Sequence, residues 1–542
     1  MRIRTLLLAA AATGAVAASG ASAAAPKARH SGVTNQQLLD EVNELKAEVA
    51  ELRAQNGNQA AAQNATQAQV AETQQQVQAV AASSAQQQQQ IAAMPAAIQT
   101  QVAQATDKAA EKAHHADKFY FKGLTITPGG FLEMAGIYRS AFQGNDLASS
   151  FAIPFPNNRA AHTSEGRFSA RQSRLSFLAE GQVSQSVKLS MYGEFDFLGG
   201  AQTANSNESN SYNPRIRNVY GTIDWNQGDH GWHLLAGQNW SLVTLNSKGI
   251  TPRNERMPPQ IDAQYIPGFT WARQPQIRLT GDFLDHKLWI AVSAENPATT
   301  FGGTIPGNVT ATQSAGSGFD AANSLSLNST PDFVGKVAYE ANLGGHSLHI
   351  EGLGLARSFK AHLNGAGNVD AHGYGVGGGA ILQVLPGLLD VQFSGLSGKG
   401  IGRYGSTQLP DVTFDANGDI HPVHEYMMLA GATVHATKML DLYGFAGEEQ
   451  QRKAVYGTFG VGLPTANNGG CFIEGGTCAG NSRRIRQLTF GFWDKIYAGS
   501  FGRAQVGIQY SYTQRQLFPG LDDDAPQAHQ NMGFLSFRYY PF

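Results

Sequence analysis

The stretch VKLSMYGEFDF, residues 187–197, decides the fold. Its odd-numbered positions are apolar or glycine, and its even-numbered positions are Lys, Ser, Tyr, Glu and Asp. A period of two is typical of a strand with one apolar and one polar face. The stretch AQVGIQYSY, residues 504–512, follows the same rule. Both predict strands that turn apolar side chains outward and polar side chains toward an aqueous lumen, as in a transmembrane β-barrel.

Segments of this kind recur from residue 119 onward. We count about sixteen, an even number of the sort that a closed antiparallel barrel needs. They lie near residues 129–140, 168–181, 187–198, 214–225, 231–239, 273–281, 286–296, 331–341, 346–358, 371–384, 388–402, 424–437, 441–456, 483–496, 501–516 and 529–542. The connections alternate between short turns and long loops, which predicts turns at the periplasmic end and loops at the outer end. Sixteen strands leave a water channel, whereas eight fill their own interior.

The two ends of the sequence suggest export and barrel assembly. Arg2 and Arg4 precede an Ala-rich apolar stretch, and Ala21-Ser22-Ala23 is a cleavage site, so residues 1–23 are predicted to be a signal peptide. No later run of 18 or more apolar residues predicts a membrane helix. The stretch FLSFRYYPF, residues 534–542, alternates, is rich in aromatics and stops on Phe542. We expect it to be the strand that the barrel-assembly machinery of the outer membrane recognises.

The composition fits a barrel better than a large soluble domain. Only 15% of the residues are charged, with 62 Gly and 28 Phe, whereas soluble domains usually carry about 25% charge. Removing Arg2 and Arg4 with the signal leaves 37 basic against 41 acidic residues, a net charge of −4. This balance argues against a nucleic-acid partner, whose binding domain should be strongly basic.

Residues 24–118 form a predicted periplasmic stalk and linker, and residues 119–542 the barrel. The stalk is rich in Ala and Gln, and Val42, Leu45, Val49 and Leu52 follow a heptad. This repeat predicts an α-helical coiled coil, most clearly over residues 35–55. A disordered Gln-rich linker is the alternative. The heptad alone leaves the number of chains open.

The two cysteines, Cys471 and Cys478, lie in a Gly/Asn-rich loop. In an oxidising compartment two such neighbours are expected to form a disulfide. No further cysteine or histidine pair has zinc spacing nearby, so we expect no metal site there.

Strand parity places several charged side chains in the lumen. Leu175 and Phe177 oppose Arg174, and charge on the lipid side would cost about 2–4 kcal/mol at mid-depth. The predicted channel-lining residues on strands are Arg174, Arg215, Arg217, Arg278, Arg503, Glu194 and Asp196. The two carboxylates are expected to oppose the arginines across the lumen.

The predicted loop of residues 240–272 carries Lys248, Arg253 and Arg256 and is stiffened by prolines. We expect it to fold into the channel, where rings of Arg or Lys select anions. The alternative places these charges at the rim, on lipopolysaccharide phosphates or acidic neighbours.

Enzyme motifs are absent from the sequence. The stretch GLSGK at residues 395–399 fails the G-x-S-x-G pattern, and His424-Glu425 lacks the second histidine of H-E-x-x-H. We therefore expect neither catalysis nor a cofactor.

Several short blocks resemble the DcaP-like porins. They are RLSF at residues 174–177, EFDF at 194–197, PRIRNVYG at 214–221, LAGQNW at 235–240 and RQPQIR at 273–278. The resemblance implies a homotrimeric outer-membrane channel with a periplasmic coiled coil that takes up small dicarboxylate-type anions. The long Ala/Gln-rich stalk, the cysteine loop and Pro541 depart from that pattern.

The sequence therefore predicts a passive porin of the outer membrane, biased toward small anions and in contact with membrane lipid and lipopolysaccharide. A structural alternative is an envelope tether, with the barrel as its anchor and the stalk directed toward peptidoglycan. A membrane hydrolase is disfavoured by the missing motifs.

Overall fold

The computed structural model describes residues 118–199, 213–314 and 324–542. The described residues belong to the second of the two units of the chain, His115–Phe542. The predicted signal peptide and heptad repeat lie outside the described residues. No helix in the described ranges is long and apolar enough to cross a membrane.

The second unit is a closed antiparallel barrel of sixteen long strands in its described residues, which confirms the predicted all-β class and strand count. The sheet closes where β25 pairs with β2, with Leu132 opposite Tyr539 and Arg139 opposite Met532. The barrel strands are β2 (Leu124–Arg139), β4 (Arg174–Gln182), β5 (Val187–Gly199), β6 (Asn213–Asn226), β7 (Gly231–Trp240), β8 (Arg273–Phe283), β9 (Leu288–Glu295), β13 (Asp332–Leu343), β14 (His346–Leu363), β15 (Gly367–Leu385), β16 (Leu389–Lys399), β19 (His424–His435), β20 (Leu440–Gln451), β23 (Ser482–Gly499), β24 (Gly502–Leu517) and β25 (Gln527–Tyr540).

Shorter elements lie at the strand ends and in the long loops. They are β1 (Phe119–Phe121), η1 (Arg159–His162), β3 (Glu165–Ser169), β10 (Val309–Thr310), β11 (Thr312–Ser314), β12 (Ser324–Ser326), η2 (Gly402–Tyr404), β17 (Val412–Phe414), β18 (Ile420–Pro422), β21 (Ala454–Tyr456) and β22 (Phe459–Val461).

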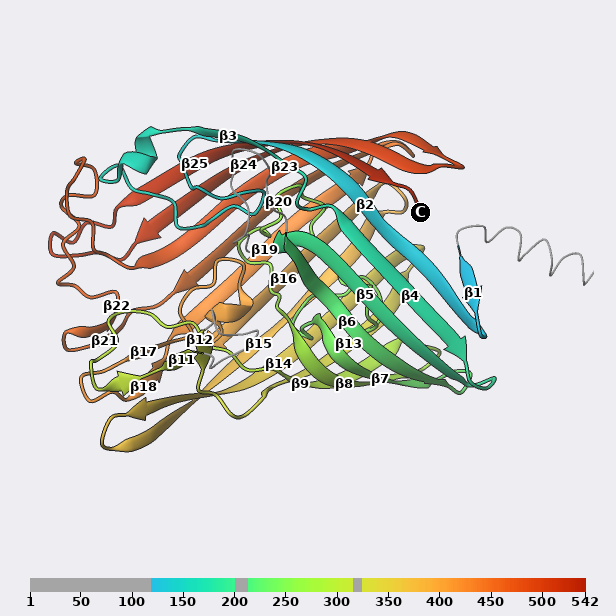
Figure 1. Cartoon of the computed structure of the whole chain (residues 1–542), viewed down its shortest axis with the longest axis horizontal. Helices are drawn as coiled ribbons and strands as arrows, with labels where there is room; N and C mark the ends of the chain where they lie inside the picture. The colour runs from blue at the N-terminus through green and yellow to red at the C-terminus, as the bar shows by residue number, and fades with distance from the viewer. Residues whose placement is uncertain (1–117, 200–212, 315–323) are drawn as a thin grey trace, which may run out of the picture. The chain divides into compact units, whose positions relative to one another are not determined.

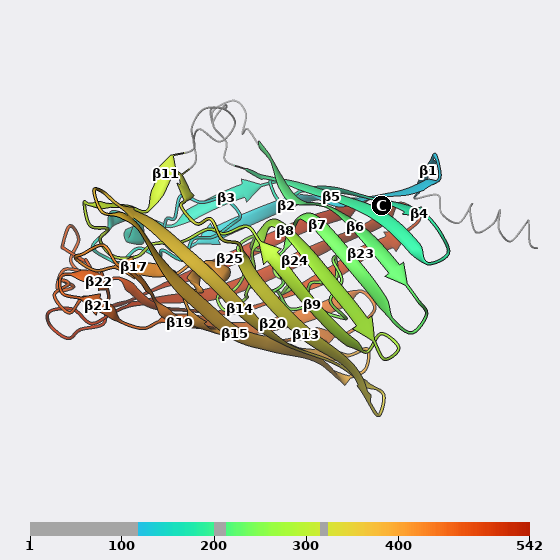
Figure 2. The same cartoon turned by 90° about the horizontal axis from the view of Figure 1, so that it is seen from below.

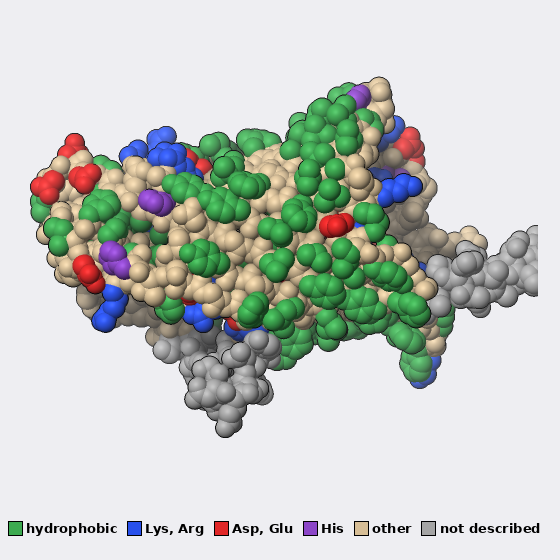
Figure 3. Space-filling view, turned by 90° about the horizontal axis from the view of Figure 1, so that it is seen from above, with side chains coloured by type: hydrophobic (Ala, Val, Ile, Leu, Met, Phe, Trp, Pro, Cys, Tyr) green, Lys and Arg blue, Asp and Glu red, His purple; other side chains and the backbone are tan. Residues whose placement is uncertain are grey.

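Side-chain parity along the strands is the predicted one. On β8 the outward Ile277 is 62% exposed, whereas the inward Gln276 and Arg278 are buried. Hydrophobic side chains cover much of the outer face in Figure 3, and charged side chains lie mostly toward its two ends. The exposed apolar surface is therefore the outside of the barrel, and the polar positions face its interior.

The long loops and the short turns lie at opposite ends. The β17–β18 and β21–β22 hairpins lie at the end away from the C-terminus (Figures 1 and 2). Two features differ from the expected strand pattern: one predicted strand is interrupted, and β14 and β15 are joined by a short turn at the end where the long loops lie.

The predicted strand at residues 168–181 is interrupted. β3 pairs with β2 from Ala135 to Arg139, and β4 pairs with β2 from Thr125 to Phe131. Between them the Glu133 N–H donates to Ser173 Oγ at 2.9 Å. A side-chain oxygen therefore replaces a backbone carbonyl as the acceptor of one hydrogen bond between the strands. The alternation of apolar and polar residues does not reveal such a break.

The strands predicted at residues 346–358 and 371–384 are longer than expected. Their ladder continues until Leu363 pairs with Gly367, so β14 and β15 form one long hairpin. In this extension the apolar Phe359, Ala361 and Val369 share the buried face, and Lys360 and His362 lie on the other. The polarity is thus the reverse of the apolar-outward pattern used to predict the strands.

Cys471 and Cys478 are joined by a disulfide in the loop between β22 and β23. Cys471 is buried against Ile153 and Phe155 of the loop between β2 and β3 and against Leu517 at the end of β24. The disulfide thus belongs to a small core that joins the long loops.

We expect the mature protein to show no free thiol without reductant. Alkylation under denaturing conditions followed by mass spectrometry should detect no modified cysteine, and two after reduction. Full labelling of both residues before reduction would contradict the disulfide.

Candidate functional site: the interior of the barrel

Residues 241–272, which connect β7 to β8, run through the interior of the barrel. Ile261 and Phe269 of this loop, both buried, pack in one cluster with Leu429, Phe445 and Trp493 of β19, β20 and β23. Those strands lie on another part of the wall from β7 and β8. The loop therefore occupies space that sixteen strands would otherwise leave to water.

Backbone N–H groups of this inward loop donate hydrogen bonds to carboxylates on distant strands. The Gly268 N–H donates to Glu449 Oε1 at 2.8 Å, and the Asn246 N–H donates to Glu351 Oε2 at 3.2 Å. Gly268 has φ +87°, and a Cβ there would collide with the Met428 carbonyl oxygen. The absence of a side chain at Gly268 thus permits both the turn and the close approach of the loop to β19.

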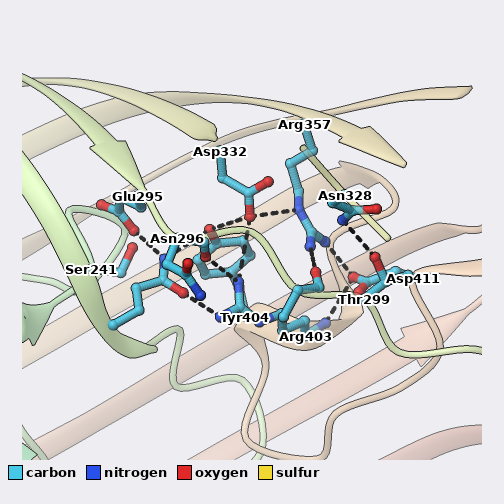
Figure 4. Close-up of polar contacts among 12 residues, drawn as sticks. Ser241, Glu295, Asn296, Thr299, Asn328, Asp332, Arg357, Arg403, Tyr404 and Asp411 are labelled. Carbon is cyan, nitrogen blue, oxygen red and sulfur yellow. Dashed lines mark hydrogen bonds and ion pairs between the residues drawn. The ribbon is translucent and has the colours of Figure 1, made fainter. Parts of the chain in front are cut away.

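A second loop, residues 400–423, also folds inward and is fixed by a buried ion network (Figure 4). The Arg357 guanidinium on β14 forms ion pairs with Asp332 at 3.1 Å and with Asp411 of the loop. The Tyr404 hydroxyl donates to Asp332 at 2.8 Å, and Arg403 lies 3.4 Å from the same carboxylate. Removing one partner of such a pair typically costs about 3–5 kcal/mol, so the network holds this loop in place.

Arg174, Glu194, Arg217, Asp196 and Arg215 form a continuous ladder of ion pairs on β4, β5 and β6. The Arg174–Glu194 distance is 3.5 Å, and Arg217 reaches Glu194 at 2.6 Å and Asp196 at 2.9 Å. Arg215 completes the ladder at 2.7 Å from Asp196. All five side chains face the interior, as parity predicted.

The expectation that Glu194 and Asp196 oppose the arginines across the lumen is wrong. Asp196 is the register partner of Arg215 on the adjacent strand, and a β-bulge on β6 brings Arg217 beside both carboxylates. The bulge follows from two consecutive inward residues, Arg217 and Asn218, opposite one on β5. The carboxylates therefore neutralise neighbouring arginines, and they do not form a second, negative wall.

Arg273 adds to this cluster, although parity did not select it. Its guanidinium carbon lies 5.1 Å from the ring centroid of Trp240 and 5.4 Å from that of Trp271. Two of its buried nitrogens, like Arg174 Nε and Arg217 Nη2, have no hydrogen-bond partner within the described part of the chain. Four arginines thus surround two carboxylates, which leaves the cluster positive.

A cavity of about 580 Å³ lies beside this cluster, toward the short-turn end. Loop residues 256–260, Asp262 and Tyr265 line it, together with residues of β2, β4, β5, β19, β20, β23, β24 and β25. Its charged lining residues are Arg174, Arg256, Lys495, Arg503, Arg538, Glu194, Asp262 and Asp441. Basic residues outnumber acidic ones in this lining.

Arg503 has the least compensated charge of this lining. Its guanidinium stacks 4.2 Å from the Tyr540 ring, and its buried Nε lacks a hydrogen-bond partner among the described residues. Burial raises the pKa of the Asp262 carboxyl on the inward loop, while the nearby Arg139 opposes this shift. Burial therefore favours the neutral form of this carboxyl, which reduces the negative charge in the cavity.

The remaining predicted residues lie apart from the cavity or at its edge. Arg278 is buried and donates to Gln276 and to the Trp240 carbonyl. Arg253 donates to the Tyr220 hydroxyl at 3.2 Å, and Arg256 pairs with Asp390 at 3.2 Å across the barrel. Lys248 lies on the same inward loop, and its surroundings suggest no role in the site.

Lys495 and Arg538 line the cavity but were not predicted. Lys495 pairs with Asp441 at 2.8 Å and Arg538 with Glu133 at 3.0 Å. Strand parity could have found Arg538, because Leu535 and Phe537 occupy the opposite, exposed face. Arg273 had no such signal, because it lies where the strand meets the loop.

Solved structures show what the chain resembles. The outer membrane channel DcaP of Acinetobacter baumannii matches with a TM-score of 0.56 and 18% identity, over 78% of this chain and 99% of that chain. An anion-selective porin from Comamonas acidovorans gives a TM-score of 0.40 at 11% identity, over 77% of this chain and 99% of its own. No family model and no curated protein matches. The chain therefore has the fold of the DcaP channel.

Proposed function

We propose that this protein is an outer-membrane porin that lets small hydrophilic solutes diffuse passively, with a bias toward anions such as dicarboxylates. The observation that carries this proposal is the barrel interior: a polar lumen narrowed by the inward loop, residues 241–272, and lined by an excess of basic side chains. The apolar outer face suits a membrane, and the DcaP-type fold agrees with a channel.

The proposed anion bias rests on local charge. Screening reduces interactions beyond about 8–10 Å in physiological salt, so a solute in the cavity responds to its lining more than to the net charge of −2 of the whole chain. The guanidinium groups of Arg174, Arg503 and Arg538 belong to this lining. They are suited to carboxylate groups, which guanidinium binds in a bidentate manner.

Planar-bilayer recordings of the refolded mature protein test this function. We expect discrete conductance steps and a reversal potential that shows anion preference in a salt gradient. Succinate added to one side should reduce the chloride current by competing for the basic wall. A protein that inserts but never conducts would rule out the porin, and cation preference would rule out the proposed bias.

We further propose a homotrimer whose residues 24–118 form a periplasmic stalk after removal of residues 1–23. The heptad and the resemblance to DcaP-like porins support this assembly. The expected result is a trimer-sized band on SDS gels without heating and a monomer band after boiling. Native mass spectrometry that finds only monomer would contradict it.

A further inference from the structure

The outward face of β16, β19, β20 and β23 carries a row of cations at the end nearest the long loops. Its members are Lys399, Arg452, Arg484 and Arg486, which we call the outer basic row. Ile485 and Gln487, the strand neighbours of Arg486, are buried in the interior, so Arg484 and Arg486 point outward. Lys399 and Arg452 are exposed at the ends of β16 and β20.

Strand pairing places these cations side by side. Lys399 pairs with His424, and the Arg452 N–H donates to the His424 carbonyl at 2.8 Å. Arg484 and Arg486 are the register partners of Gln450 and Glu448 on β20. Across the sheet, four neighbouring strands span roughly 14 Å, from a spacing of about 4.8 Å per strand. Along the strands, Arg486 is level with Glu448 and so lies about 13 Å below Arg452. The row is therefore compact enough for one multiply charged group to touch several of its members.

The outer basic row is poorly neutralised. Glu448 lies 3.9 Å from Arg484, and its other oxygen accepts from the Tyr426 hydroxyl at 2.6 Å. Lys399 and Arg452 form no ion pair within the part of the chain that the structure describes. The row keeps an excess of positive charge on the outside of the barrel, where a solute in the lumen cannot reach it.

An apolar groove of about 460 Å³ begins directly below the outer basic row. One step along the strands, the outward side chains form the series Phe393, Ala430, Ala446, Leu488 and Tyr512, each the register partner of the next. The two alanines leave a trough between the larger Phe393 and Leu488, which are 52% and 50% exposed. Arg486 and Glu448 line its upper end.

We propose that this face binds a phosphorylated lipid of the outer leaflet, a lipopolysaccharide, with its lipid A phosphates on the outer basic row and an acyl chain in the groove. This inference rests on the outer-membrane placement proposed above. Guanidinium and phosphate form strong, charge-assisted and bidentate hydrogen bonds. The groove adjoins the row, so one molecule with an anionic head and an apolar tail satisfies both. A second copy of this barrel that covers the groove is the alternative, and the groove variant below distinguishes it.

The test measures binding of deep-rough lipopolysaccharide to the full mature protein in detergent. We expect Lys399→Ala/Arg452→Ala/Arg486→Ala to weaken binding by roughly tenfold or more, because charge-assisted hydrogen bonds to the phosphates are lost. The control Lys122→Ala/Lys287→Ala/Lys438→Ala removes the same charge from exposed residues at the short-turn end and should bind as the wild type does. Chemically dephosphorylated lipopolysaccharide should bind wild type and both variants equally weakly. Equal affinity of the first variant and the wild type would overturn the proposal.

Ala446→Phe tests the groove separately. It should weaken binding of intact lipopolysaccharide and leave binding of its deacylated, phosphorylated sugar unchanged. If Ala446→Phe instead turns an oligomer into monomers without changing lipopolysaccharide affinity, the face is a subunit contact and the lipid site is wrong. All these variants should keep the wild-type conductance, so the lipid site can fail while the porin stands. A wild-type protein that binds lipopolysaccharide but does not conduct would refute the porin alone.

Discussion

Replacing residues 246–264 with a short Gly-Ser linker is expected to raise the single-channel conductance several-fold. These residues cross the interior and include Ile261, which packs on the opposite wall. Without them the sixteen strands enclose a wide aqueous lumen. The barrel wall itself stays complete, because β7 and β8 pair directly from Gly231–Asp282 to Trp240–Arg273. Single-channel recording in planar bilayers gives the measurement.

Two controls show whether the effect comes from the loop. The variant should still change its gel mobility on heating, which reports a folded barrel. Glu449→Gln retains an oxygen that can accept from the Gly268 N–H and should conduct nearly as the wild type does. Unchanged conductance in a folded deletion variant would mean that the loop does not limit ion flow.

Replacing Arg215, Arg217 and Arg278 with Ala should shift the reversal potential toward cation selectivity and slow the entry of dicarboxylates. Arg215 and Arg217 pair with Asp196 and Glu194, so their removal leaves these two carboxylates with only Arg174 and Arg273 beside them, and the cluster is no longer positive. Local charge, and not the total, governs permeation over the screening length of about 8–10 Å. The measurement is the reversal potential in a salt gradient, together with the rate of succinate entry into liposomes.

A compensating variant separates charge from structure. Adding Glu194→Gln and Asp196→Asn to the triple variant leaves Arg174 and Arg273 as the charges of this cluster, and should restore anion preference. Lost pairing of a buried carboxylate costs about 3–5 kcal/mol, so the triple variant is also expected to unfold at lower temperature. A triple variant with the selectivity of the wild type would show that these arginines only stabilise the wall.

Alternation along the strands is a local property, and the sequence therefore determined what depends on it. The pattern of VKLSMYGEFDF, residues 187–197, predicted the strand β5 and the inward Glu194 and Asp196. Repeated along the chain, it predicted sixteen strands and the inward positions of Arg174 and Arg503. A residue next to apolar, lipid-facing neighbours has one choice of face, because a shift by one position would reverse every side chain.

The tertiary structure alone decided which charges meet and how the interior is filled. The bulge at Arg217 and the pairing of β5 with β6 turned two expected opposing walls into one ion-pair ladder. Arg357 meets Asp411, 54 positions later, because a loop folds back into the barrel. Burial of apolar loop residues such as Ile261 against distant strands drives that folding. Such contacts join parts of the chain that no local period relates, so the path of the loops, and with it the shape and charge of the cavity, follows only from the folded barrel.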